Sequence, residues 1–325
     1  MSETMSIGDI LLEKLIRCFY GGSINVLLQP DDLSLMTWDW QQKFLDATVK
    51  SSLLAKYPIN RQFVRLFLKK TIEQLEGKQE VHDDFYSYLC LAMRNNGTEE
   101  SFSHKHYLIN NLKDVITIKE TNKIVVNGTT GMRTWEAALM LADWALCHKE
   151  TFSNKNIFEL GSGVGFTGIT IGKYCQPRCI HLSDCHPEVI KAICDNIKIN
   201  FPQSKVKNTT LCKIEERMKI GAMLLDWNSL EDLPDSVVPD VVIGADIVYD
   251  PSLLQSLCEV IKEFFKRNQH ADVYIASVIR NEKTFQAFLK NLDDMNFKYQ
   301  KLPFNKSVFI EWDHQIEKCL LKINS

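Results

Sequence analysis

The segment Ile157-Phe158-Glu159-Leu160-Gly161-Ser162-Gly163-Val164-Gly165 decides the fold of this chain. An apolar run ends at an acidic residue, three glycines follow at every second position, and a helical pattern continues through Ile169, Ile171 and Tyr174. Glycines suit such a turn, because a Cβ atom would hinder both the sharp change of direction and the approach of a ligand to the backbone. A strand, a glycine-rich turn and a helix form the first unit of a nucleotide-binding α/β sheet.

The spacing of the glycines distinguishes between cofactors. The dinucleotide pattern G-x-G-x-x-G requires glycine at position 166, which is Phe166 here. The observed pattern is E-x-G-x-G-x-G, with Glu159 at the end of the strand, and it resembles motif I of the class I S-adenosylmethionine (SAM) methyltransferases. SAM carries an ammonium and a sulfonium and has no phosphate, so an acid beside the turn suits it. A structural turn in an unrelated α/β protein is the alternative.

Composition restricts the class of protein. The net charge is −3 and the isoelectric point about 6.3, which argues against direct nucleic-acid binding, because domains that bind nucleic acid are usually basic. Ten cysteines include no C-x-x-C pair, and we predict no metal site. The N-terminus lacks the pattern of a signal peptide, and no apolar run reaches the length of a membrane span. We therefore expect a soluble cytoplasmic protein without a membrane partner.

Periodicity divides the chain into two parts. Apolar residues at helical spacing predict a helical N-terminal domain over residues 1–100, and the polar segment 95–104 is the expected boundary. An α/β domain is predicted over residues 105–325. It begins with a β-hairpin in which residues 115–118 pair with residues 124–126.

From residue 156 onward, predicted strands and helices alternate. The strands are expected at about 156–160, 179–184, 222–227, 240–247 and 272–279, the helices at about 165–175, 187–200, 251–267 and 281–292, and two final strands at 296–302 and 316–323. This alternation predicts a mostly parallel sheet covered on both faces. A terminal hairpin that inserts one antiparallel strand resembles the class I methyltransferase sheet.

Asp184 ends the second strand of the alternating series, expected at about 179–184, and lies 23 residues after Gly161. That spacing is close to the separation expected for an acid that binds ribose hydroxyls. A carboxylate accepts hydrogen bonds from two neighbouring hydroxyls at once. The alternative is that Asp184 caps the helix that begins at Pro187.

Asp226 and Trp227 follow the third strand, at the edge of the sheet where ligands bind. Trp227 is suited to stack on adenine, and Asp226 is suited to accept a hydrogen bond from its exocyclic amine. The alternative for Trp227 is that it covers the edge of the sheet.

Ala245, Asp246 and Tyr249 follow the fourth strand. Ala245 is small enough to leave its backbone open to a cofactor, and Asp246 is placed near the methyl group that would be transferred. We predict that Asp246 orients an incoming lysine ammonium, and that Asp246→Ala retains SAM binding and loses most methyl transfer. The alternative is that Asp246 caps the helix after Pro251 while Tyr249 packs in the core.

These motifs occur in one order that resembles a known family. Thr130-Gly131-x-x-Thr134-Trp135-Glu136 precedes the glycine turn, and S-D, L-D-W and D-x-x-Y follow it. The set is similar to the seven-strand lysine methyltransferases often called family 16. The resemblance implies an α/β fold of the class I SAM methyltransferase type, which is a Rossmann-like, mostly parallel, seven-stranded sheet with an α-helical N-terminal domain. It also implies SAM contacts from Trp135, Gly161, Ser162, Gly163, Asp184, Trp227 and Ala245, and a lysine entrance lined by Asp246 and Tyr249.

The expected partner also follows from the resemblance. Within the family, residues 127–131 and 183–186 are most similar to the members that act on translation elongation factor 2, so a protein substrate, elongation factor 2, is expected. The N-terminal domain is then expected to dock that substrate. A catalytically weak binding or adaptor protein that keeps the fold, and a small-molecule methyltransferase, are the alternatives. The long polar stretch 202–219 departs from the family pattern.

Overall fold

The structure is a computed structural model that describes residues 6–24, 28–94, 101–110, 114–203, 212–214, 218–304 and 307–325. The chain forms two compact units, Met1–Asn122 and Lys123–Ser325, called unit 1 and unit 2 below. Most of the predicted boundary segment lies outside the described residues. The first two strands of the chain belong to unit 1, together with the helices.

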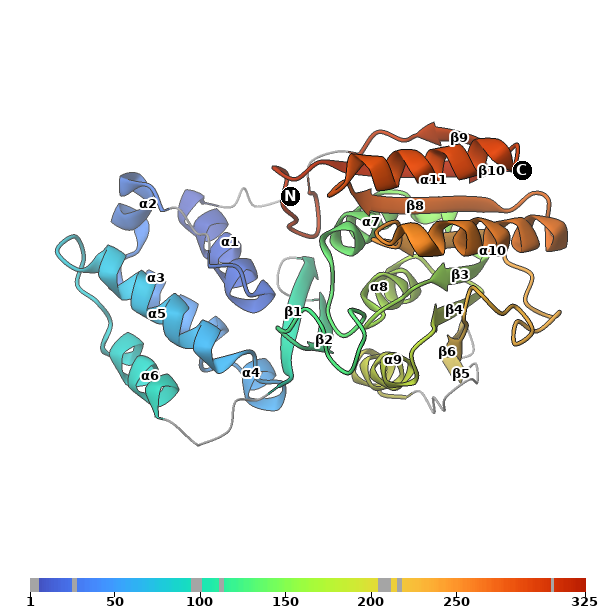
Figure 1. The fold of residues 1–325 in the computed structure, drawn as a ribbon. Coiled ribbons are helices and arrows are strands. Elements are labelled where there is room, and N and C mark those ends of the chain that lie inside the picture. Colours follow the sequence, from blue (N-terminus) through green and yellow to red (C-terminus); the bar gives the residue numbers. More distant parts are fainter. Residues whose placement is uncertain are drawn as a thin grey trace. The chain divides into compact units, whose positions relative to one another are not determined.

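Unit 1 is built from helices around an aromatic core. The helices are α1 (Ile7–Gly21), α2 (Pro30–Leu35), α3 (Trp38–Ala47), α4 (Ser52–Lys56), α5 (Arg61–Leu75) and α6 (Asp83–Met93) (Figure 1). Gly22, with a φ of 76°, caps the end of helix α1 in the left-handed conformation that glycine adopts readily. The rings of Phe19 and Phe67 are 5.3 Å apart, and Phe44 packs on both. These aromatic side chains therefore lie in the core of this unit.

The first hairpin of the chain pairs different strands from those predicted. Strand β1 (Ser103–Asn110) pairs antiparallel with β2 (Asp114–Glu120), whereas Ile124 and Val125 are exposed. The sequence pattern did not predict β1, because the first half of this strand is polar. His106 is nevertheless buried, and its Nδ1 lies 2.9 Å from Thr117 Oγ1 across the two strands. This cross-strand contact helps to set the register of the pair.

His106 makes the stability of unit 1 depend on pH. Burial lowers the pKa of His106 from 6.5 to about 4. The unfolded chain therefore binds a proton at a higher pH than the folded chain, and stability is lost as the pH falls from 6.5 towards 4. We expect this residue to reduce the free energy of unfolding by about 2 kcal/mol between pH 7.5 and pH 5. Urea unfolding of the wild type and of His106→Gln at both pH values measures the effect. Equal pH dependence in the two proteins would contradict it.

Unit 2 contains one eight-stranded sheet. Its strands are β3 (Asn156–Leu160), β4 (Cys179–Asp184), β5 (Cys212–Ile214), β6 (Met218–Leu224), β7 (Val241–Ala245), β8 (Asp272–Val278), β9 (Lys298–Lys301) and β10 (Lys318–Asn324). The order across the sheet is β5-β6-β4-β3-β7-β8-β10-β9. The five central strands from β6 to β8 are parallel, and β10 is inserted antiparallel between β8 and β9. The seven expected strands are present, and the short antiparallel edge strand β5 adds an eighth.

Helices cover both faces of this sheet, as the alternation predicted (Figure 1). They are α7 (Glu136–Cys147), α8 (Phe166–Tyr174), α9 (Pro187–Asn200), α10 (Leu254–Arg267) and α11 (Glu282–Asp294), with single 3₁₀ turns at Lys149–Thr151 and Pro251–Leu253. Helices α10 and α11 pack on the face that carries Phe158 and Leu160. Helix α8 lies on the other face, towards which Glu159 points.

The third predicted strand begins and ends earlier than expected. Strand β6 runs over Met218–Leu224, so Leu225, Asp226 and Trp227 lie beyond its carboxyl end. The polar stretch before it falls mostly outside the described residues. The shift leaves Asp226 and Trp227 in the loop at the edge of the sheet.

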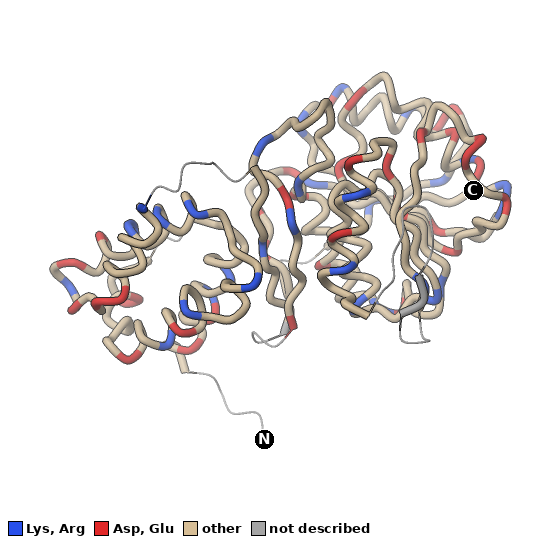
Figure 2. The backbone as a smooth tube through the Cα atoms, turned by 90° about the horizontal axis from the view of Figure 1, so that it is seen from below, with Lys and Arg blue, Asp and Glu red and all other residues tan. Residues whose placement is uncertain are grey.

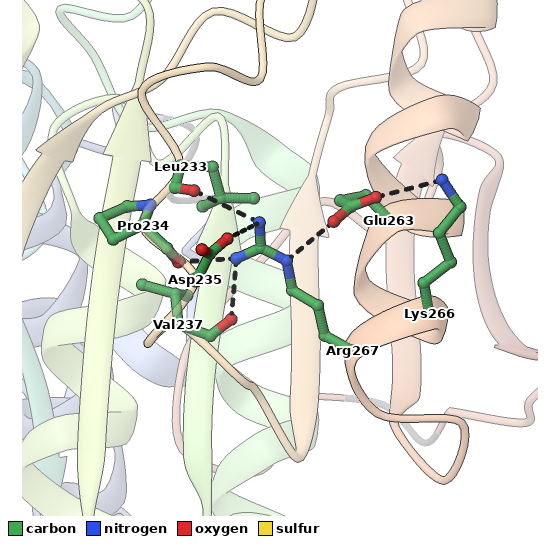
Figure 3. Close-up of polar contacts among 7 residues, drawn as sticks. All are labelled: Leu233, Pro234, Asp235, Val237, Glu263, Lys266 and Arg267. Carbon is green, nitrogen blue, oxygen red and sulfur yellow. Dashed lines mark hydrogen bonds and ion pairs between the residues drawn. The ribbon is translucent and has the colours of Figure 1, made fainter.

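Arg267 at the end of α10 holds the loop that leads into β7 (Figure 3). Its guanidinium donates to the carbonyl oxygens of Leu233, Pro234 and Val237 at 2.7 to 3.3 Å, and its Nε donates to Glu263 at 3.0 Å. These bonds fix the entry of β7, the strand whose far end carries Ala245.

Acidic and basic residues are interspersed along the chain in both units (Figure 2). Within the described residues, no helix is long and apolar enough to cross a membrane.

Candidate active site

The predicted site residues meet at the carboxyl edge of the sheet in unit 2. Strands β6, β4, β3 and β7 are neighbours in that order, and each contributes residues from its carboxyl end or the loop that follows. Open parallel sheets bind ligands at this edge. Among the described residues, no cluster of His, Cys, Asp or Glu side chains is suited to hold a metal ion.

The turn after β3 depends on glycine. Gly161, Gly163 and Gly165 have φ values of 58°, 53° and 86°, a region that other residues rarely adopt. A Cβ atom on Gly161 would lie 2.7 Å from Ile247 Cγ2, and one on Gly163 would lie 3.1 Å from the carbonyl oxygen of Gly131. The turn is therefore enclosed by the loop after β7 and by the segment that precedes α7.

Ser162 connects this turn to β4. Its backbone N–H donates to the Ser183 carbonyl oxygen at 2.7 Å, and its Oγ accepts from the Ser183 N–H at 3.0 Å. Ser183 Oγ in turn donates to the Glu159 carbonyl oxygen at 2.7 Å. These bonds hold the turn in one conformation. A contact between Ser162 and SAM stays a prediction.

Glu159 lies beneath the turn, and only 2% of its surface is exposed. A Cβ atom on Gly168 would lie 2.5 Å from Glu159 Oε2, so α8 passes directly over the carboxyl group. Burial raises the pKa of Glu159 to about 8. Oε2 has no hydrogen-bond partner among the described residues. A direct contact between Glu159 and SAM stays a prediction, and the observed position is one that supports the turn from below.

Asp184 faces the glycine turn. Its carboxylate accepts from the N–H of Gly163 at 3.2 Å and from the N–H of His186 at 3.1 Å. The cap of α9 is His186, whose Nδ1 accepts from the Glu188 N–H. Burial raises the pKa of Asp184. The alternative that Asp184 caps α9 is therefore not what the structure contains, and its carboxylate stands where a ligand over the turn would meet it.

We expect Asp184→Ala to weaken SAM binding by about 10- to 100-fold, because two hydrogen bonds from a ribose to a carboxylate would be lost. Isothermal titration calorimetry measures the dissociation constant directly. Asp195→Ala, which changes a partly exposed acid on α9, is the matched control and should leave the affinity unchanged. Equal affinities for the wild type and Asp184→Ala would remove Asp184 from the cofactor site.

Trp227 lies beside the first glycine of the turn. Its Cζ2 would be 3.5 Å from a Cβ atom on Gly161, and its ring is partly buried against the core of unit 2. Asp226 is exposed and uses one carboxylate oxygen within its own loop, where it accepts from the backbone and side-chain nitrogens of Asn228 at 2.9 and 3.0 Å. The geometry brings Trp227 to the turn, whereas the adenine contact predicted for Asp226 has only its second oxygen available.

Asp246 occupies a more constrained position than the sequence suggested. Its φ is 55°, and only 4% of its side chain is exposed. The carboxylate accepts from the N–H of Val278 at 2.9 Å and of Ala137 at 3.2 Å, and it forms a two-pronged ion pair with Arg280, both contacts being 3.3 Å. The residue that caps the turn after β7 is Asp250, which accepts from the Ser252 N–H. Asp246 thus joins the ends of β7 and β8 to the start of α7.

Two arginines that the sequence analysis did not select contact Trp135. The guanidinium carbons of Arg133 and Arg280 lie over the Trp135 ring, 5.0 and 5.3 Å from its centroid, at cation–π distance. Trp135 Nε1 donates to the Thr130 carbonyl oxygen at 3.0 Å. Arg280 follows the carboxyl end of β8, so the strand-end rule that selected Asp246 would also have found it.

Tyr249 follows β7 at the same edge of the sheet, and 53% of its surface is exposed. Burial of its hydroxyl raises its pKa, and a hydrogen bond with Thr130 opposes that shift. Thr130 belongs to the loop 127–131, which His186 Nε2 approaches at 3.2 Å from the Asn127 carbonyl oxygen. The loop therefore lies at the same edge as the glycine turn, and Tyr249 is not a core residue.

The segment between β9 and β10 also reaches the start of α7. The buried Asp143 carboxylate accepts from the N–H groups of Val308, Phe309 and Ile310 at 2.7 to 3.2 Å. Glu136 Oε2 accepts from the Asp313 N–H at 3.0 Å. Sequence periodicity gives no signal for such a long-range contact between a helix and a loop.

These residues suit SAM. A Cβ atom on Gly161 or Gly163 would meet Ile247 or the Gly131 carbonyl oxygen, so the turn keeps this path only with glycine, and Asp184 supplies acceptors for hydroxyls. The buried Nε of Arg133 has no hydrogen-bond partner among the described residues, so a donor for an anionic group is also present. The site thus offers hydrogen-bond acceptors for the ribose hydroxyls of SAM and a donor for its carboxylate.

Comparison with known proteins shows the family to which the chain belongs. Residues 111–295 match the family model described as lysine methyltransferase. The chain is 31% identical to protein-lysine N-methyltransferase EEF2KMT of Bos taurus over 96% of this chain and 94% of that protein, and 30% identical to the Homo sapiens protein of the same name over 96% and 93%. A solved structure titled M. jannaschii TYW2 in complex with AdoMet is 15% identical and covers 70% of this chain and 87% of that chain, with a TM-score of 0.40. The chain belongs to the lysine methyltransferase family and uses S-adenosylmethionine as its methyl donor.

Proposed function

We propose that this protein transfers a methyl group from SAM to a lysine side chain of translation elongation factor 2. The observation that carries the proposal is the match, over 96% of the chain, to relatives named EEF2KMT. Because the match extends through unit 1, the proposal concerns the whole protein. The substrate is a translation factor, so the proposal places the reaction in the cytoplasm.

The cofactor end of the site is assigned to residues around the glycine turn. Gly161 and Gly163 let the backbone approach the ligand, Asp184 accepts from the ribose hydroxyls, and Trp227 covers the adenine. SAM supplies an already activated methyl group, so the residues of this chain mainly align donor and acceptor.

The acceptor end is assigned to Asp246 and Tyr249. At pH 7 only about one lysine in 10³ is neutral in water, and the neutral form is the nucleophile. A confined channel beside the positive sulfonium lowers the pKa of the incoming amine. The Tyr249 phenol is neutral at pH 7 at its ordinary pKa, which burial raises further, and it provides a hydrogen-bond acceptor for that amine at the exposed mouth. Asp246 positions the surrounding elements, and no general base is assigned.

A labelling experiment tests the proposal. Purified protein is incubated with methyl-labelled SAM and a lysate from cells that lack the endogenous enzyme. One labelled band that peptide mass spectrometry identifies as elongation factor 2, methylated on lysine, is the expected result. A labelled metabolite in place of a protein would support the small-molecule alternative. No label despite measured SAM binding would support the binding-protein alternative.

Unit 1 is proposed to dock the protein substrate. Because the β1–β2 hairpin groups with the helices, the deletion that tests this role ends at residue 122, not at residue 100. We expect the KM for elongation factor 2 to rise by about 10-fold or more in the variant lacking residues 1–122. The affinity of this variant for SAM should change by less than about 2-fold. Thermal unfolding of the variant checks that unit 2 remains folded. An unchanged KM in a folded variant would remove the docking role.

A further inference from the structure

We propose that Arg133 binds the carboxylate of the methionyl group of SAM. The inference rests on the established cofactor and on one contrast in the site. Arg133 and Arg280 both lie over the ring of Trp135. The charge of Arg280 is neutralised by an ion pair with Asp246, whereas the buried Nε of Arg133 has no partner among the described residues.

Arg133 comes from the segment that encloses the glycine turn. The carbonyl oxygens of Gly131 and Arg133 would lie 3.1 and 3.8 Å from a Cβ atom on Gly163. The backbone of this segment therefore touches the turn where the cofactor binds. The side chain extends over Trp135, for which the resemblance of the chain to the family implies a contact with SAM.

The guanidinium of Arg133 has unused donors. Its Nε is buried and has no hydrogen-bond partner among the described residues. A buried donor without a partner costs free energy of folding unless a ligand satisfies it. A carboxylate is the group that a guanidinium fork binds with two parallel hydrogen bonds.

The other cations described near Asp246 are already occupied. Arg280 forms its two-pronged pair with the Asp246 carboxylate. Lys318 Nζ donates to the backbone carbonyl oxygens of Asp313 and Ile316. Of these three cationic side chains, only Arg133 has a buried donor without a partner among the described residues, so it is assigned to the carboxylate.

The two acids at this edge of the sheet already have other roles, because Asp184 is assigned to the ribose hydroxyls and Asp246 is paired with Arg280. Asp184 stands over the turn, and the carboxylate of Asp246 is neutralised by Arg280. A SAM molecule whose carboxylate were left unpaired would have to bury that charge beside Trp135, which is costly. Arg133 removes that cost and fixes the direction in which the methionyl chain leaves the turn.

Decarboxylated SAM is the probe that isolates this contact, because it keeps the adenosine, sulfonium and amine and lacks only the carboxylate. Calorimetric titration of the wild type should give about 10- to 100-fold tighter binding of SAM than of decarboxylated SAM. In Arg133→Met the affinity for SAM should fall by about the same factor, while the affinity for decarboxylated SAM stays within about 2-fold. Arg133→Lys should keep part of the discrimination.

Controls separate the contact from a general effect on folding. Arg178→Met removes an exposed arginine just before the amino end of β4, the end opposite to Asp184. This variant should change the affinity neither for SAM nor for decarboxylated SAM. Thermal unfolding of each variant without ligand shows whether the fold is kept. Because no protein substrate is used, failure of the proposed elongation factor 2 reaction does not affect the outcome.

Two results would overturn the assignment. Equal weakening of both ligands by Arg133→Met would show that Arg133 supports the site without contacting the carboxylate. Discrimination that persists in Arg133→Met and disappears in Arg280→Met would place the carboxylate on Arg280 instead.

Discussion

Asp246→Ala is expected to lower the free energy of unfolding by about 2 to 4 kcal/mol and to abolish measurable methyl transfer. The substitution leaves the N–H groups of Ala137 and Val278 without their acceptor and removes the ion-pair partner of Arg280. It also frees the start of α7, where Trp135 is placed. From the sequence we predicted that SAM binding would survive; the observed contacts lead us to expect weaker SAM binding as well.

Urea unfolding without ligand, SAM titration and single-turnover methyl transfer measure the three effects separately. Asp250→Ala is the matched control, because Asp250 lies four residues later and only caps a single 3₁₀ turn. Asp246→Asn keeps the size of the side chain and tests the charge. A variant that kept normal stability and SAM affinity and lost only turnover would show that Asp246 acts on the incoming lysine and not on the framework.

Gly163→Arg is expected to weaken SAM binding by more than about 100-fold. Two costs combine: the backbone at position 163 has a φ of 53°, and a Cβ atom would lie 3.1 Å from the Gly131 carbonyl oxygen, so the segment that precedes α7 would have to shift. Calorimetric titration with SAM and the labelling assay both report the loss.

Gly77→Arg is the control for backbone strain alone. Gly77 has a φ of 76° and no atom within 4 Å of an added Cβ, and it lies in unit 1. We expect this variant to bind SAM normally. Loss of SAM binding in both variants would mean that backbone strain at a glycine, and not the contact with the segment that precedes α7, explains the effect at position 163.

Local pattern was enough to predict most of unit 2. The E-x-G-x-G-x-G turn, the buried run of β7 and the helix that begins at Pro187 each have a signature within about a dozen residues. The parallel sheet follows from their alternation, because parallel strands need helical crossovers. The same rule placed Asp184, Trp227 and Asp246 at one edge.

The partners of these residues were set only by tertiary structure. Asp246 appeared free in the sequence, whereas the fold brings it Ala137 from 109 residues earlier and Arg280 from 34 residues later. The β1–β2 pairing was missed for a related reason, since a buried histidine made β1 look polar. Local periodicity encodes which face of an element is apolar, and thus determined the fold class and the location of the site. It carries no information on which donors a buried carboxylate meets, and the packing of distant segments decided that.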